Sequence, residues 1–183
     1  MDWPVAVVAG GTSMLKSLFR ERRRARIVNA ILERDLGGEA ETLRRLVETA
    51  ATSFNAPFAL LSLIDSDRQW LVAAHGVELT CVPRDDGFCR CALDVSGVLE
   101  CCDPPGDPRF AQLPVVTGDP HVRYYIGAPL RLSNGIDVGA LCVIDLVPRR
   151  PASADQRAYL VALARQASLA IESSDDRFVR MSA

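Results

Sequence analysis

Apolar residues that recur every three or four positions predict two amphipathic helices, one on either side of a region of strands. The first begins at Glu39 and stops before Pro57, and its buried face is predicted to hold Leu43, Leu46, Val47, Ala50 and Phe54. The second begins at Ser153, where Ser153 and Gln156 form the pattern of a capping box. Its buried face is predicted to hold Leu160, Leu163, Ala164, Ala167 and Ile171.

Short apolar runs between these helices predict antiparallel strands. They cover residues 58–65, 69–75, 98–102, 124–132 and 137–145. The polar turn from Asp65 to Arg68 is short, so the first two strands should pair as a hairpin. Asn134-Gly135 joins the last two strands, and it favours a primed turn because such a turn needs positive φ. The pattern predicts an α+β fold with one central sheet, helices on one face and loops on the other.

The first 38 residues differ from the rest, since they form a charged helical stretch bounded by glycine pairs. A weak heptad pattern, interrupted at Arg22 and Asn29, consists of Leu15, Leu18, Ala25, Leu32 and Leu36. It is compatible with a helix packed on its own domain or with a coiled coil between two subunits. The chain is therefore expected to divide into an N-terminal helical extension (1–38), a main domain (39–174) and a C-terminal tail (175–183).

Composition and charge narrow the class of protein. With 49% hydrophobic and 24% charged residues the chain is typical of globular proteins, and no apolar run approaches the roughly 18 residues that a membrane span requires. The net charge of −2 predicts no general attraction to nucleic acid. The basic run from Arg20 to Arg26 is interpreted as a solvated helix face, because no aromatic residues are interleaved with it.

The short apolar run 5–9 does not have the length of a signal-peptide core, and Asp2 stands where such a signal carries positive charge. A cytoplasmic location is therefore expected. In that reducing compartment the 6 cysteines are expected to be free thiols.

A proline-rich segment from Asp103 to Val122 is the longest predicted loop, and loops of this length inside a compact domain are usually functional. Asp107-Pro108 has the pattern of a helix start. Arg109 is expected to pair with an acid such as Asp103, and Phe110 to bury its ring under the loop. These residues either hold the loop shut or contact a ligand.

Three residues at the end of this loop enter the following strand at alternate positions. His121, Arg123 and Tyr125 are expected to share one face, because alternate residues of a strand do. From that face they would offer hydrogen-bond donors to a polar or anionic ligand.

Cys89 is the candidate reactive thiol. It is predicted to open a short helix close to Arg84 and Arg90, which would lower its pKa, although packing as a small apolar residue is the alternative. Adjacent Cys101 and Cys102 must face opposite sides of a strand, so they do not suit a shared tetrahedral metal site. One of the two is expected on the loop-covered side, and no metal is expected.

Ordered motifs along the chain resemble the GAF family of small-molecule sensor domains. They read NAPFALLSLIDSDRQWLVAAHGV, VPRDDGFC, DPRF, VTGDPHVRYYIGAPL and GALCVIDLVPR, and they span about Leu36 to Glu172. The resemblance implies a profilin-like antiparallel sheet of five or six strands, with a ligand pocket between the sheet and the long loops. It also implies an output partner such as a histidine kinase or a diguanylate cyclase. No such module is found in the chain, so a lone sensor domain or a piece of a longer protein is expected.

The expected function is that of a non-catalytic bacterial sensor domain, which binds a small molecule and acts through its terminal helices in a homodimer. The candidate ligand-binding residues are Phe88, Cys89, Cys102, Asp103, Arg109, Phe110, His121, Arg123 and Tyr125. Neither nucleic acid nor a membrane is an expected partner. The residues identify no ligand or cofactor, because pockets of one fold take unrelated molecules. The alternative is a cysteine-dependent redox enzyme or thiol redox sensor similar to free methionine-R-sulfoxide reductase, which shares the fold.

Overall fold

The computed structural model describes residues 11–34 and 37–173 and has the predicted α+β fold. Its α-helices are α1 (Gly11–Leu32), α2 (Gly37–Phe54), α3 (Pro114–Thr117) and α4 (Ala154–Ser173). Its strands are β1 (Phe58–Ile64), β2 (Arg68–His75), β3 (Cys81–Pro83), β4 (Leu99–Cys101), β5 (Tyr124–Arg131) and β6 (Asp137–Asp145). Short 3₁₀ helices are η1 (Arg84–Asp86), η2 (Cys89–Ala92) and η3 (Pro104–Gly106).

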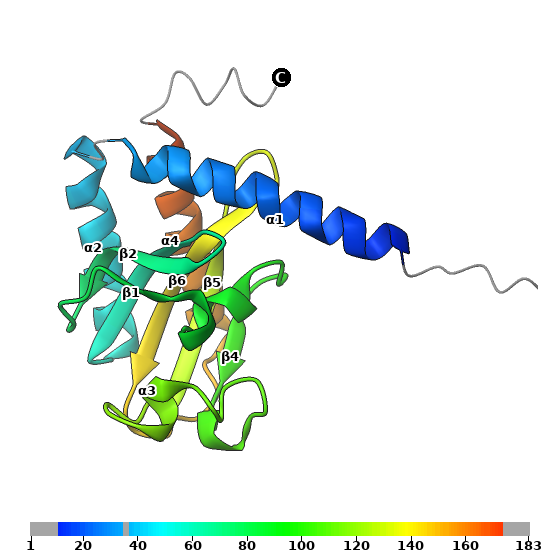
Figure 1. Ribbon diagram of the computed structural model, residues 1–183. Coiled ribbons are helices and arrows are strands. Elements are labelled where there is room, and N and C mark those ends of the chain that lie inside the picture. The colour runs from blue at the N-terminus through cyan, green and yellow to red at the C-terminus, as the bar shows by residue number, and fades with distance from the viewer. Residues whose placement is uncertain (1–10, 35–36, 174–183) are drawn as a thin grey trace, which may run out of the picture.

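The strands form one antiparallel sheet in the order β3-β2-β1-β6-β5-β4 (Figure 1). Five of them were predicted from apolar runs, whereas the three-residue edge strand β3 was not. Its pairing with β2, from Arg68 opposite Pro83 to Trp70 opposite Cys81, is too short to leave a periodic signal. The sheet places long apolar strands in the centre and short strands at both edges.

Alternation along the strands separates two apolar clusters, one on each face of the sheet. Ala59, Leu61 and Leu63 of β1 pack with residues of α1, α2 and α4. Leu60 and Ile64 face the opposite side, where they pack with residues from the loops. The prediction of helices on one face and loops on the other is confirmed. Among the described residues, no helix combines the length and apolarity needed to cross a bilayer.

Helix α1 packs on the domain through a face that differs from the predicted seam. Ile27, Val28 and Ile31 belong to the helix-side core, whereas Leu18 and Phe19 are 49% and 66% exposed. The alternative of a helix packed on its own domain is confirmed, because the 27, 28 and 31 positions lie on one apolar helical face that the domain covers. The dimer and the domain boundary at residue 38 stay predictions. Leu36 and the tail 175–183 lie outside the described residues.

The basic run of α1 is only partly a solvated face. Arg22, Arg23 and Arg26 are exposed, but Arg24 is 1% exposed and forms an ion pair with Glu21. Burial is the main cause that lowers the pKa of Arg24 to about 10. The expectation of a fully solvated face therefore fails at this one arginine.

Two local predictions have different outcomes. The capping box of α4 is confirmed, since the Ser153 amide donates to Gln156 Oε1 over 3.0 Å and the Gln156 amide donates to Ser153 Oγ over 3.1 Å. The β5–β6 hairpin is also confirmed, but its turn is not primed. Only Gly135 has a positive φ there, of +77°, and its amide donates to the Leu132 carbonyl over 2.9 Å. A three-residue loop places glycine, not Asn134, at the left-handed position.

Candidate functional site: an apolar cavity under the loops

A cavity of about 300 Å³ lies between the loop-side face of the sheet and the segments that cover it. Leu60 of β1, Leu71 of β2 and Ile144 of β6 line it from the sheet. Val115 of α3 and Val122 line it from the proline-rich loop. The remaining lining residues are Phe58, Gln69, Val77, Leu79, Val82, Pro83, Asp86, Gly87, Phe88, Cys89, Pro114 and Pro120. The predicted loop-covered pocket is therefore present, and its walls are predominantly apolar.

Phe88 joins the cavity wall to a buried aromatic cluster. Its ring stacks on Tyr125 with centroids 4.9 Å apart and lies 4.8 Å from the ring of Phe110. All three residues are buried in the loop-side core, but only Phe88 lines the cavity. Phe110 does bury its ring, as predicted. Phe110 and Tyr125 thus support the wall from behind and do not line the cavity.

A buried polar chain occupies one corner of the cavity. Gln69 Nε2 donates to Ser62 Oγ over 3.0 Å, and the Ser62 hydroxyl donates to Cys89 Sγ over 3.8 Å. Cys89 Sγ in turn lies 3.6 Å from Cys142 Sγ on β6. Gln69 Oε1 has no hydrogen-bond partner within residues 11–34 and 37–173. This corner provides the polar chemistry of an otherwise apolar wall.

Cys89 begins η2, as predicted, but its electrostatic setting differs from the prediction. The hydrogen bond with Cys142 is the largest effect that lowers the pKa of Cys89, against the opposing effect of burial. Arg84 donates instead to Glu21 and to the Asp65 carbonyl, and Arg90 lies near Asp85. A second thiol, not a neighbouring cation, therefore perturbs Cys89.

Cys101 and Cys102 face opposite sides of the sheet, as predicted. Cys101 belongs to the loop-side core and Cys102 packs against the helix-side core, so Cys102 is remote from the cavity wall. All 6 cysteines are free thiols. Among the described residues, no group of three His, Cys, Asp or Glu side chains is arranged to hold a metal ion.

Asp103 and Arg109 do not form the predicted pair. Arg109 Nη2 lies 2.6 Å from Asp107 Oδ2, while Asp103 Oδ1 accepts from the Gly106 amide over 3.3 Å. Asp107 is preferred because its carboxylate also accepts the Arg109 amide, over 2.9 Å. This hydrogen bonding with Arg109 lowers the pKa of Asp107 to about 2. The segment after Asp107 is a single turn, not a helix, and neither Asp103 nor Arg109 lines the cavity.

The predicted shared face of His121, Arg123 and Tyr125 does not form. His121 is exposed and has a φ of +60°, which breaks the extended alternation before β5 begins at Tyr124. Arg123 Nη1 donates to the Val116 carbonyl over 3.2 Å and so holds α3 against the strand. Of the predicted candidates, the structure therefore brings Phe88 and Cys89 to the cavity. Val122, between two of the others, lines it instead.

The sequence-based prediction missed most of the wall, including Leu60, Leu71 and Ile144. Strand alternation could have found them, because each faces the side opposite the helix-packed residues. Gln69 is a further lining residue that could have been found, because it is an uncharged polar residue at the start of the mostly apolar predicted strand 69–75.

The sequence comparison decides the family. Residues 39–171 match the sequence profile described as the GAF domain. The chain belongs to the GAF domain family. Its cavity lies where this resemblance implied a pocket, between the sheet and the long loops.

Relatives of this GAF domain have several functions. A cyclic di-GMP phosphodiesterase of Pseudomonas aeruginosa is 41% identical over 128 residues, which are 70% of this chain but 22% of that protein. The chain thus spans about a fifth of that relative's length. Among solved structures, the GAF domain of a phosphoenolpyruvate-protein phosphotransferase from Coxiella burnetii has a TM-score of 0.63 at 17% identity, covering 91% of this chain and 96% of its own.

A free methionine-R-sulfoxide reductase from Neisseria meningitidis, solved with its substrate, is also similar to this GAF domain. Its TM-score is 0.60 at 18% identity, and the match covers 100% of this chain and 98% of that one. At such identities the likeness shows the fold alone.

Proposed function

We propose that this GAF domain is a cytoplasmic, non-catalytic sensor that binds a small, predominantly apolar molecule in the cavity under its loops. The observation that carries the proposal is the cavity of about 300 Å³ with Leu60, Leu71 and Val115 on opposing walls. Concave apolar sites with a few polar groups are typical of small-molecule pockets, which hold roughly 300–1,000 Å³. Binding would order the loop Asp103 to Val122, which supplies one wall.

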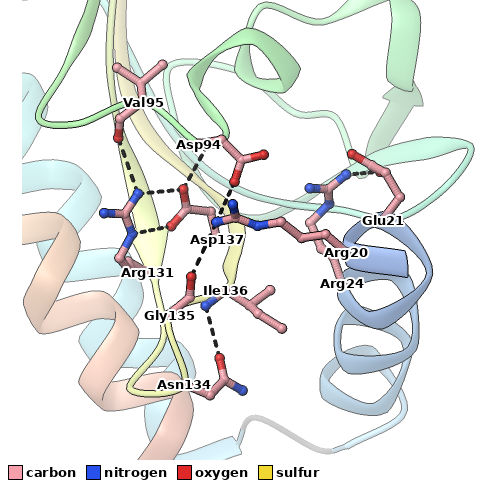
Figure 2. Close-up of polar contacts among 10 residues, drawn as sticks. All are labelled: Arg20, Glu21, Arg24, Asp94, Val95, Arg131, Asn134, Gly135, Ile136 and Asp137. Atoms are coloured by element: carbon pink, nitrogen blue, oxygen red, sulfur yellow. Dashed lines mark hydrogen bonds and ion pairs between the residues drawn. The ribbon is translucent and has the colours of Figure 1, made fainter. Parts of the chain in front are cut away.

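Two ion pairs support a route from the cavity to α1. The segment 83–94 lines the cavity through Pro83, Asp86, Phe88 and Cys89. The same segment contains Arg84 and Asp94. Arg84 Nη1 lies 3.0 Å from Glu21 Oε2. Asp94 Oδ1 lies 2.7 Å from Arg20 Nη2, and Figure 2 shows this second pair. Displacement of this wall segment on binding would therefore alter the docking of α1.

The output is proposed to pass through the terminal helices to a second subunit and a signalling partner. Leu18 and Phe19 are exposed on α1 and offer an apolar surface for a homodimer. The relationship to a cyclic di-GMP phosphodiesterase and the resemblance to domains found beside histidine kinases favour a bacterial signalling module as the partner.

Hydrogen–deuterium exchange with benzofuran, an apolar ring without a hydrogen-bond donor, tests this proposal. Saturating benzofuran is expected to slow amide exchange in residues 103–122 by about tenfold or more, because burial of the ring stabilises the closed loop. Val115→Trp fills the cavity and should abolish both the binding and the protection. Val147→Trp, at an exposed position that is not among the lining residues, is the matched control. Unchanged exchange in the unsubstituted protein at saturation would contradict the mechanism.

Thiol redox chemistry is a second candidate, which the 3.6 Å separation of Cys89 and Cys142 favours. A peroxide that enters the cavity would be reduced by the Cys89 thiolate, which becomes a sulfenic acid while water or an alcohol leaves. The Cys142 thiol would then attack that sulfur, release water and form a disulfide.

Intact-mass measurement after hydrogen peroxide treatment tests this chemistry. Redox activity predicts the loss of two hydrogens per chain and a Cys89–Cys142 crosslinked peptide. Cys142→Ser should stop the reaction at the sulfenic acid, whereas Cys102→Ser, on the other side of the sheet, should leave it intact. Thiols of Cys89 and Cys142 that remain reduced while the half-buried Cys81, Cys91 and Cys102 are oxidised would rule this candidate out.

A further inference from the structure

A second concave site lies between α1, the turn of the β1–β2 hairpin and η1. This cleft has a volume of about 520 Å³ and shares no lining residue with the apolar cavity under the loops. Its described lining residues are Glu21, Arg22, Ala25, Arg26, Ser66 and Arg84. The cleft therefore brings one face of α1 to two segments that are far from it in the sequence.

Positive charge dominates the cleft. Three arginine side chains line it, and Glu21 is the one acid among the described lining residues. The Glu21 carboxylate is also shared with Arg24, which is buried on the same helix (Figure 2). The whole chain, in contrast, has a net charge of −2. The cleft thus concentrates cations that its single carboxylate does not balance, and such a local excess attracts anions.

Arg22 and Arg26 supply this charge from the helix. Both side chains are exposed, and neither forms an ion pair with a residue in 11–34 or 37–173. They stand four positions apart on α1, an arrangement in which like charges repel each other and destabilise a helix. An anion bound between them would remove that repulsion.

Arg84 approaches the cleft from the domain with accessible donors. Its Nη1 donates to Glu21 Oε2 over 3.0 Å and to the Asp65 carbonyl over 3.2 Å. Within the described residues, Nε and Nη2 have no hydrogen-bond partner, and neither atom is buried. The two Nη1 contacts therefore hold the guanidinium in place, while its other nitrogens remain open to a ligand. Such preorganisation lowers the entropic cost of binding.

We infer that this cleft binds the phosphate group of a small molecule, either a phosphate ester or a free diphosphate. Guanidinium groups present paired N–H donors that match phosphate oxygens. Arg22 and Arg26 would contact the phosphate from α1 and Arg84 from the domain, so the bound group bridges the two. The volume of about 520 Å³ is within the range of small-molecule sites and leaves room for more than one phosphate group. This site is additional to the apolar cavity and does not depend on it.

Isothermal titration calorimetry of the full chain with inorganic pyrophosphate tests the cleft. The ionic strength is kept constant with sodium chloride, because salt screens exposed charges. Saturable binding of one pyrophosphate per chain is expected, with a dissociation constant below about 1 mM. AMP and adenosine distinguish the sources of phosphate: binding of AMP without adenosine indicates a phosphate ester, and binding of pyrophosphate alone indicates a free diphosphate. Adenosine that binds as well as AMP would contradict recognition of phosphate.

Arg26→Gln removes one guanidinium from the cleft and should weaken the binding of pyrophosphate about fivefold or more. Arg23→Gln is the matched control, since Arg23 is an exposed arginine of the same helix outside the lining, and it should change the affinity by less than twofold. Saturating pyrophosphate should also slow amide exchange in α1, because the ligand holds the helix on the domain. Equal losses in the two variants would reveal a general attraction to charge and overturn the inference. The absence of saturable binding of both pyrophosphate and AMP would also overturn it.

Discussion

Replacement of Gly139 by alanine is expected to destabilise the protein by about 3 kcal/mol or more, or to prevent folding. Gly139 lies on β6, opposite Leu63 of β1 and Leu130 of β5, in the centre of the sheet. A Cβ there would lie 1.8 Å from the Ser62 carbonyl oxygen and 3.0 Å from the Leu63 Cα. Both are backbone atoms of the adjacent strand, so relief requires β1 and β6 to separate.

Urea denaturation followed by circular dichroism measures this effect. Gly97→Ala is the matched control, because an added Cβ there meets nothing within 4 Å and only the φ of +88° opposes it. That strain is expected to destabilise the control by about 1 kcal/mol. A Gly139→Ala protein as stable as the Gly97→Ala protein would mean that β1 and β6 are not packed as described.

The second large effect is expected at Asp137, where alanine should lower the free energy of unfolding by about 2–4 kcal/mol. The Asp137 carboxylate is fully buried and accepts from Arg131 Nε over 2.7 Å, from Arg131 Nη2 over 2.8 Å and from the Asp94 amide over 2.8 Å (Figure 2). Its removal leaves the part-buried Asp94 amide without an acceptor and Arg131 without its bidentate partner.

The Asp137 substitution should also loosen α1. Asp94 pairs with Arg20, so the loss of the Asp94–Asp137 hydrogen bond is expected to increase amide exchange in the first residues after η2 and in α1. Glu41→Ala serves as the control, since Glu41 pairs with Arg44 and Arg45 on an exposed helix face and should contribute little. Equal stability of the Asp137→Ala and Glu41→Ala proteins would contradict the assigned role of Asp137.

The candidate site divides into residues that sequence reasoning could find and residues that it could not. Phe88 and Cys89 were named through the family motif, and both line the cavity. Leu60 and Leu71 follow from strand alternation once the helix-packed face is known. Arg109 and His121 were misplaced because a local partner, Asp107, and a left-handed φ of +60° direct these loop side chains.

The sequence by itself determined the α+β class, the two amphipathic helices, five of the six strands and the family, because these depend on local periodicity and ordered motifs. Tertiary structure alone decided which face of α1 is buried, that Cys89 meets Cys142, and that Gln69 holds an unpaired carbonyl. The physical reason is that each of these features depends on contacts between segments that are distant in sequence. Their distances depend on how the two faces of the sheet are covered, which no local pattern encodes.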